Sequence, residues 1–199
     1  MNYRIKKAKL FLGAAIFALI LYIFCLPRQL FHTPYATVAA DRNGDLLGAR
    51  IAADGQWRFP ASDTVPEKFK QCLIEFEDRY YRYHWGVNPV SISRALVRNI
   101  KSKRIVSGGS TITMQVIRLS RGEKRTVTEK AIEIILATRL EFRYSKTKIM
   151  SLYASHAPFG GNVVGIDAAA WRYFGHSSNH LSWAEAATLE MVQIGRAHV

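Results

Sequence analysis

Hydrophobic and polar residues divide the chain into an apolar start and a patterned remainder. No charged residue occurs between Leu10 and Leu26, and this run reaches the lower limit of about 17 residues for a helix that spans a bilayer. Four basic residues precede it: Arg4, Lys6, Lys7 and Lys9. Because basic flanks stay in the cytoplasm, we expect a cytoplasmic tail (residues 1–9), an anchor (10–27) and an exported remainder. A cleaved signal peptide is the alternative, but the nearest small-residue cleavage pattern, Val38-Ala39-Ala40, lies too far downstream.

After the apolar run, residues 37–59 alternate between apolar and polar positions. Two turn sequences interrupt the alternation, Asn43-Gly44-Asp45 and Asp54-Gly55, and such turns join short antiparallel strands. The sequence therefore predicts a small antiparallel β element over residues 36–62, between the anchor and the main domain.

From Pro66 onward the apolar residues recur at helical spacing. The first stripe comprises Phe69, Cys72, Leu73, Phe76, Tyr80 and Tyr83. Further helices are predicted over residues 92–100, 111–119, 127–144, 146–154, 166–174 and 183–191, with loops at 107–109 and 158–161. Two helix starts carry capping-box pairs, Thr126 with Glu129 and Ser182 with Glu185. The main domain, residues 63–193, is therefore predicted to be mainly α.

The composition adds a strong positive charge to this picture. The 199 residues carry a formal net charge of +13 and are 49% hydrophobic, which suits one folded domain with an appendage. The charge favours an anionic partner: nucleic acid, an acidic membrane surface or a phosphorylated substrate. Basic and aliphatic residues interleave over residues 92–106, as in a segment at a membrane interface or on an ordinary solvated helix face. Cys25, in the apolar run, and Cys72, in the domain, are not expected to pair.

The first candidate for chemistry is a carboxylate pair beside aromatic residues, in the segment Glu77-Asp78-Arg79-Tyr80-Tyr81-Arg82-Tyr83-His84-Trp85-Gly86. Desolvation by aromatic surface can raise the pKa of a carboxylate, as a general base requires. The alternative is that Glu77 pairs with the neighbouring arginines on a solvated face.

The second candidate is a Gly-Gly turn that leads into a helix, in the segment Ser107-Gly108-Gly109-Ser110-Thr111-Ile112-Thr113-Met114-Gln115. Free backbone N–H groups and hydroxyls at such a helix start can hold an anion. Ordinary helix capping is the alternative.

The third candidate is Lys130 with Glu133, one turn apart on the predicted long helix. The two side chains suit a phosphate and a second reacting group, or else a surface ion pair of little energetic value.

Taken together and in order, the three segments resemble motifs of glycosyltransferase family 51, the peptidoglycan polymerases of class A penicillin-binding proteins. The first motif is matched by Glu77, Asp78, Tyr81, His84 and Gly86. The second, Gly-Gly-Ser-Thr-aliphatic-Thr-Gln-Gln, is matched over residues 108–115 except at Met114, and the third by Lys130 and Glu133. A fourth resembles residues 145–153. The resemblance covers residues 37–191.

This resemblance implies a lysozyme-like α-helical fold with a glycan-binding groove beside a membrane-touching lobe. The growing strand on undecaprenyl pyrophosphate would be the donor and lipid II the acceptor of an inverting transfer that forms β-1,4-linked glycan. Glu77 would deprotonate the acceptor 4-hydroxyl, and Glu133 would assist at the donor site. The substrate-binding residues would be Asp78, Tyr81, His84, Ser110, Thr111, Gln115, Arg118 and Lys130. Of these, Arg118 and Lys130 would supply positive charge to the leaving pyrophosphate.

The resemblance also sets expectations about cofactors and location. No cofactor is required, although a divalent cation such as magnesium assists some members; the sequence shows no metal-ligand set. The anchor would hold the catalytic domain on the periplasmic or outer face of the bacterial plasma membrane, where other cell wall synthesis proteins are candidate partners. Nucleic acid is not expected, because an exported domain without a reading helix does not suit it.

Several residues depart from the family pattern. Glu129 stands where the third motif has Arg, Ser155 and His156 replace Asn-Arg in the fourth, and Ala154 replaces Leu.

Two other patterns are treated as coincidental. Ser145-Lys146-Thr147-Lys148 fits the Ser-x-x-Lys motif of transpeptidases, but the other motifs of that active site do not follow. The second is the His176/His180 pair in a Ser-Ser-Asn loop. The final residues Ile194-Gly195-Arg196-Ala197-His198-Val199 can be encoded by a string that resembles a sequencing adapter, so we expect a non-native tail at 194–199 and a truncated frame.

Two other functions compete with polymerisation. The departures at Glu129 and Ser155 would suit a membrane-tethered module that binds lipid II as a weakly active or inactive scaffold. A lysozyme-like groove can also host glycan hydrolysis with an acidic carboxyl group. Binding without polymerisation would indicate the first, and release of fragments from sacculi the second.

Overall fold

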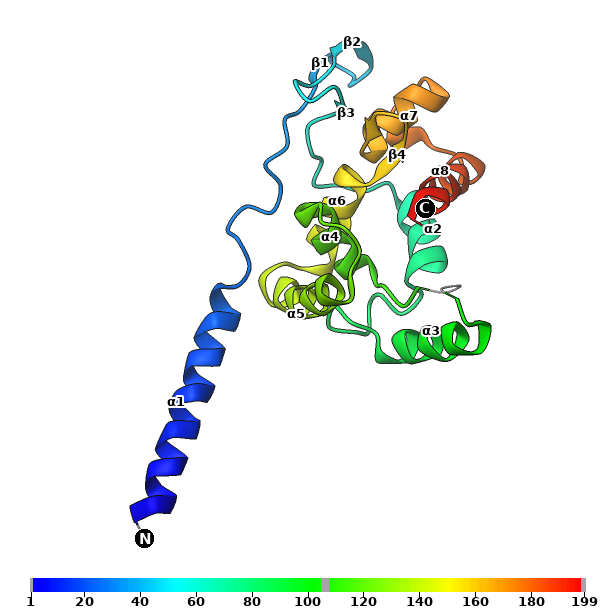
Figure 1. Cartoon of the computed structure of the whole chain (residues 1–199). Helices are drawn as coiled ribbons and strands as arrows, with labels where there is room; N and C mark the ends of the chain where they lie inside the picture. Colours follow the sequence, from blue (N-terminus) through cyan, green and yellow to red (C-terminus); the bar gives the residue numbers. More distant parts are fainter. Residues whose placement is uncertain (1, 105–107, 198–199) are drawn as a thin grey trace.

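A long N-terminal helix projects from a mainly helical domain (Figure 1). The computed structural model describes residues 2–104 and 108–197, with the side chains of 7–104 and 108–192. Helix α1, Asn2–Phe24, contains the one stretch in these described residues that is long and apolar enough to cross a membrane, Lys7–Phe24, of which 0% is buried. It begins earlier than the predicted anchor and ends before residue 27, and Leu26, just beyond its end, is buried against the domain.

Helix α5, Val127–Arg143, holds the end of α1 to the domain. Arg139 and Arg143 donate hydrogen bonds to backbone carbonyls at the end of α1 and just beyond it. Leu26 and Leu30, which follow α1, are part of the hydrophobic core. The connection between anchor and domain is therefore packed and hydrogen-bonded.

The β structure differs from the single antiparallel element predicted for residues 36–62. Strands β1 (Thr37–Ala40) and β2 (Leu46–Arg50) do form an antiparallel hairpin. Strand β3 (Trp57–Arg58) instead pairs in parallel with β5 (Val163–Val164), which pairs antiparallel with β4 (Pro158–Gly160) where a loop was predicted. The reason is tertiary: the Trp57 amide donates to the Asn162 carbonyl, and the buried Arg58 is bonded to Pro34 and Asp54.

The helices confirm the predicted mainly α class. They are α2 Glu67–Glu77, α3 Pro89–Ser102, α4 Ile112–Arg121, α5, α6 Lys146–His156, α7 Ile166–Phe174 and α8 Trp183–Ala197, with a 3-10 turn at Ser178–His180. Helix α4 is the centre of the core, because Ile112 to Ile117 are all buried between α5 and α6. Its polar side chains are consequently fixed in place.

The prediction that the first apolar helical stripe continues through Tyr83 is wrong in its second half. Helix α2 ends at Glu77, where Asp78 leaves helical geometry with φ −154° and ψ 72°. Tyr80 and Tyr83 lie in turns and are exposed, at 51% and 81%. Two other predicted segments lie partly outside the described residues. They are the basic stretch with its following loop, at residues 105–107, and the tail, at residues 198–199. Residues 194–197 of the tail belong to α8.

Candidate active site

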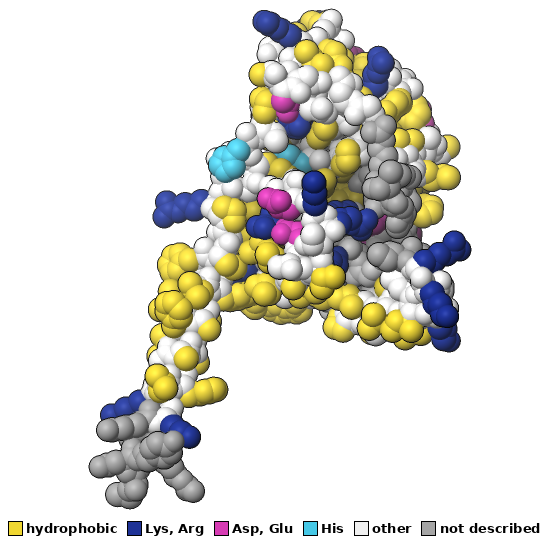
Figure 2. All heavy atoms as spheres, viewed as in Figure 1, with side chains coloured by type: hydrophobic (Ala, Val, Ile, Leu, Met, Phe, Trp, Pro, Cys, Tyr) yellow, Lys and Arg dark blue, Asp and Glu magenta, His cyan; other side chains and the backbone are white. Residues whose placement is uncertain are grey.

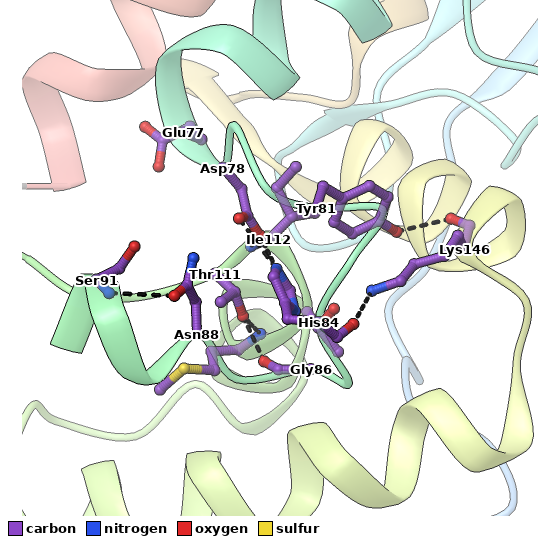
Figure 3. Close-up of polar contacts among 12 residues, drawn as sticks. Glu77, Asp78, Tyr81, His84, Gly86, Asn88, Ser91, Thr111, Ile112 and Lys146 are labelled. Carbon is purple, nitrogen blue, oxygen red and sulfur yellow. Dashed lines mark hydrogen bonds and ion pairs between the residues drawn. The ribbon is translucent and has the colours of Figure 1, made fainter.

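Asp78 links three segments of the site (Figure 3). Its carboxylate accepts hydrogen bonds from the His84 Nε2 at 3.0 and 2.9 Å and from the backbone N–H of Ile112 at 3.1 Å. Asp78 is 6% exposed. One carboxylate therefore ties the end of α2, the aromatic turn and the start of α4 together.

The aromatic turn is held from its other side by Lys146. The Tyr81 hydroxyl donates to the Lys146 carbonyl, and the Lys146 ammonium donates to the His84 carbonyl and the Glu141 carboxylate. Burial raises the pKa of the Tyr81 phenol, which therefore remains a donor. Gly86 completes the turn at φ +81°, where a Cβ would lie 2.5 Å from the Ala137 carbonyl oxygen, so only glycine fits.

The Gly-Gly turn is confirmed as the entry to a helix. Thr111 is the N-cap of α4: its hydroxyl accepts from the Met114 N–H and donates to the Gly86 carbonyl. Thr111 is buried, whereas Ser110 remains half-buried. At Gly109 a Cβ would lie 2.7 Å from the Ile92 Cα, so this turn packs directly against the start of α3.

Glu77 is separated from Asp78 although the two are adjacent in sequence. In Figure 3 its carboxylate points away from the Asp78–His84 contact. It accepts a hydrogen bond from the Gln115 side-chain amide, Nε2 to Oε2 at 2.5 Å. The other end of that amide, Gln115 Oε1, accepts from Arg118 at 3.1 Å and from the Tyr153 hydroxyl at 3.3 Å. A buried amide thus fixes the orientation of the Glu77 carboxylate.

Lys130 and Glu133 form the ion pair predicted from their spacing, but it is not a surface pair. The Lys130 ammonium donates to Glu133 at 2.9 Å and to the Ser110 hydroxyl at 2.6 Å, and Glu133 is 4% exposed. Burial lowers the pKa of Lys130, while the bond to Glu133 opposes that shift. The pair therefore sits beneath the Gly-Gly turn.

Arg118 interacts electrostatically with both carboxylates, Glu77 and Glu133. Burial and the charge of Arg125 lower the pKa of Arg118, and the carboxylates of Glu133 and Glu77 both raise it. The charges of Glu77 and Glu133 thus both act on Arg118, which contacts Gln115 directly.

The ten predicted site residues consequently fall into two groups. The structure brings six together around α4 and the start of α5: Glu77, Ser110, Gln115, Arg118, Lys130 and Glu133. The other four form the buried support of the aromatic turn and the α4 N-terminus: Asp78, Tyr81, His84 and Thr111. We call these the groove group and the support group.

The departures from the family pattern have structural consequences. The Thr126 hydroxyl caps the Glu129 N–H, but the Glu129 carboxylate makes a two-bond ion pair with Arg121 and thus does not complete the predicted capping box. His156 stacks on Phe31, with ring centroids 3.6 Å apart. The replacement at 156 therefore packs the segment after α1 against the domain.

The two coincidental patterns have structural explanations. Ser145 is the N-cap of α6, and Lys148 pairs with Asp63. His176 contacts Glu185, while His180 is exposed. Throughout the described part of the chain, no group of three or more His, Cys, Asp or Glu side chains is arranged to hold a metal ion.

One ionisable residue at this site was missed in the sequence. Glu190 of α8 is fully buried, and both of its carboxyl oxygens lack a hydrogen-bond partner. Burial and the Glu77 charge raise its pKa to about 8. The available signal was its position one turn after Ala186 in the helix predicted over residues 183–191.

The chain belongs to the transglycosylase family: the family model described as "Transglycosylase" matches residues 44–195. Helices α2 to α7, the groove group and the support group all lie within that match, whereas α1 precedes it and α8 extends slightly beyond it. The family expected from the motif series is therefore confirmed.

The relatives of the chain carry the names of penicillin-binding proteins. It is 41% identical to penicillin-binding protein 1C of Escherichia coli over 83% of this chain and 22% of that protein. It is 37% identical to penicillin-binding protein 1A of Aquifex aeolicus (90% and 25%) and 35% identical to penicillin-binding protein 1A/1B of Bacillus subtilis (79% and 17%). The chain thus spans a quarter or less of the length of these relatives.

Proposed function

We propose that this domain is a peptidoglycan glycosyltransferase that polymerises lipid II into β-1,4-linked glycan strands. The observation that carries the proposal is the arrangement of the groove group. The carboxylate of Glu77 is oriented by Gln115, which also accepts a hydrogen bond from Arg118, and Lys130 pairs with Glu133 at the same site. A base and a cationic site for phosphate are what this transfer requires.

The residues would divide the reaction as follows. Glu77 accepts the proton of the acceptor 4-hydroxyl as its oxygen attacks the donor anomeric carbon with inversion. The bond from that carbon to the lipid pyrophosphate breaks, and Arg118 and Lys130 stabilise the negative charge that develops on the leaving group. Glu133 orients Lys130 through the 2.9 Å ion pair.

The support group would act through other residues. Because Asp78, Tyr81, His84 and Thr111 bond to one another's segments, we assign them to positioning of Glu77 and the α4 N-terminus. Ser110 and Gln115 would line the groove with the catalytic carboxylates.

No step is assigned to a metal ion. The described residues offer no cluster of carboxylate or imidazole ligands, and the ammonium and guanidinium groups of Lys130 and Arg118 supply the positive charge themselves.

The membrane would place the groove beside its lipid-linked substrates. Hydrophobic side chains cover α1 and gather along the edge of the domain formed by α5 and α3 (Figure 2). The exposed members on these two helices include Val90, Leu96, Val97, Ile100, Val127, Ile135 and Phe142. With α1 as a single-pass anchor and its basic end in the cytoplasm, this edge would rest on the outer face of the bilayer.

The test is extension of labelled lipid II by the purified full chain in lipid vesicles. We expect polymerisation by the wild type and its loss in Glu77→Gln. Glu75→Gln is the matched control, because Glu75 lies on the same helix, is exposed and contacts Arg79. Undiminished polymer in Glu77→Gln contradicts the assignment. Lipid II binding without any polymer in the wild type would instead indicate the scaffold function.

A further inference from the structure

Two arginines of α5 bind the backbone at the end of the anchor helix. The Arg139 guanidinium donates from Nε to the Ile23 carbonyl at 3.0 Å. The Arg143 guanidinium donates from Nη1 to the Pro27 carbonyl and from Nη2 to the Arg28 carbonyl, both at 2.5 Å. One helix of the domain thus holds three carbonyls at and just beyond the end of α1. We call Arg139 and Arg143 the arginine clamp.

The clamp acts where the backbone of α1 needs partners. The last four carbonyls of a helix have no intrahelical donor, and Ile23 is one of these residues because α1 ends at Phe24. A guanidinium beside a helix C-terminus also interacts favourably with the helix dipole. The arginines therefore stabilise the end of α1 in the position in which α5 holds it.

Further contacts strengthen this joint. The Tyr22 and Thr138 hydroxyl oxygens lie 3.0 Å apart. Because the Thr138 hydroxyl donates its own proton to the Ile135 carbonyl at 2.7 Å, the Tyr22 hydroxyl is the donor to Thr138. After α1, Leu26 and Leu30 are buried in the hydrophobic core. Side chains before and after the end of α1 are therefore fixed to the domain, as a flexible linker would not be.

The helix that carries the clamp also carries part of the groove group. Lys130 lies near the start of α5 and donates to Ser110 and Glu133. The helical rise of 1.5 Å per residue places Lys130 and Arg143 about 20 Å apart along this helix. Helix α5 packs against α4 and α6, so it belongs to the rigid part of the domain. The direction of the anchor is consequently fixed relative to Lys130.

We propose that Arg139 and Arg143 are positioning residues for lipid-linked substrate, because they hold the groove group at one height and orientation above the bilayer. A lipid chain in the hydrocarbon keeps its pyrophosphate at the level of the headgroups. A domain on a loose joint samples many orientations, and only a fraction of them meets that level. Apparent affinity falls in proportion to the competent fraction, whereas turnover of bound substrate does not. The kinetic effect rests on the proposed function, but the rigid joint does not.

The rigid joint is tested by pulsed EPR on the full chain in lipid vesicles. The two native cysteines are first replaced, as Cys25→Ser and Cys72→Ser. Nitroxide labels are then attached at Ala14→Cys on α1 and Gln71→Cys on α2, both at exposed positions. Because α2 ends at Glu77, the distance between the labels reports the direction of the anchor relative to the proposed base.

The clamp predicts one narrow distance distribution in this labelled parent and a broad one in the double variant Arg139→Gln/Arg143→Gln. Arg98→Gln is the matched control, because Arg98 is an exposed arginine of α3, and it should keep the narrow distribution. A broad distribution in the labelled parent, or equal widths in the parent and the double variant, overturns the proposal.

The effect on substrate is tested by steady-state polymerisation of lipid II. In vesicles the double variant should raise KM by about 3- to 10-fold, for a competent fraction of about 0.1 to 0.3, with kcat unchanged. In detergent micelles, where no flat bilayer sets the height of the substrate, its KM should equal that of the wild type. Arg139→Lys/Arg143→Lys should recover the wild-type KM in vesicles, because an ammonium can donate to the same carbonyls.

The outcomes separate positioning from damage to the site. A KM that rises equally in micelles, or a fall in kcat alone, shows a distorted site and overturns the positioning role. A wild type that has the narrow distance distribution but makes no polymer contradicts the proposed function, and the kinetic role with it, while the rigid joint stands.

Discussion

The Gln115 side-chain amide donates a hydrogen bond to the Glu77 carboxylate, Nε2 to Oε2 at 2.5 Å. Gln115 is itself held by Arg118 and Tyr153 and is 5% exposed. The orientation of the proposed base is therefore set by the most enclosed helix of the core.

Replacement of this amide should weaken catalysis. We expect Gln115→Ala to lower kcat for lipid II polymerisation by about 10- to 100-fold, because Glu77 loses its fixed orientation. The measurement is steady-state polymerisation, with thermal unfolding to verify the fold. Gln71→Ala is the control, because Gln71 is an exposed amide on α2. A wild-type kcat in Gln115→Ala would contradict this role.

Removal of the Asp78 charge should act on stability. Asp78→Asn puts an amide NH2 donor in place of one of the two carboxylate oxygens that contact the His84 Nε2, and an unmet buried donor costs about 1–3 kcal/mol. We expect a loss of about that size in the free energy of unfolding, measured by chemical denaturation. Asp63→Asn, at an exposed ion pair with Lys148, should change stability by less than about 1 kcal/mol; equal effects for the two would refute the structural role of Asp78.

Release of Arg121 from its ion pair should strengthen the interaction with pyrophosphate. Glu129→Gln removes the carboxylate that binds the Arg121 guanidinium, so we expect inorganic pyrophosphate to inhibit polymerisation at several-fold lower concentration, with steeper salt dependence. Glu123→Gln removes an equal charge nearby without breaking that ion pair and is the control. Identical inhibition of Glu129→Gln and the wild type would show that Arg121 does not serve the pyrophosphate.

Stability should fall as pH rises because of Glu190. Its pKa is raised from 4.5 to about 8 in the folded chain, so between these pH values the folded state retains a proton that the unfolded state releases. The linkage then lowers the free energy of unfolding by up to about 1.4 kcal/mol per pH unit in this window. Denaturation at several pH values should show a shallower fall in Glu190→Gln than in the wild type; parallel curves would contradict the buried, protonated state.

The sequence predicted the local elements well because their signals are local. The helical periods located every helix of the main domain, and the apolar run located α1 to within a few residues at its C-terminal end. The prediction of a helical stripe through Tyr83 was wrong because a tertiary contact ends α2. The Asp78 carboxylate accepts a hydrogen bond from the start of α4, 34 residues away. Strand β3 pairs with β5 for the same kind of reason.

By itself, the sequence determined the mainly α class, the apolar N-terminal helix and the ordered motif series that places the chain in its family. Only the tertiary structure decided which motif residues gather around α4 and the start of α5 and which hold the aromatic turn. Glu77 and Asp78 are neighbours in sequence, yet one is held by Gln115 and the other by His84 and Ile112. It also decided that Glu129 binds Arg121 and that Glu190 is buried on α8. Periodicity records which face of an element is apolar, whereas the partner of a polar side chain depends on how separate elements pack.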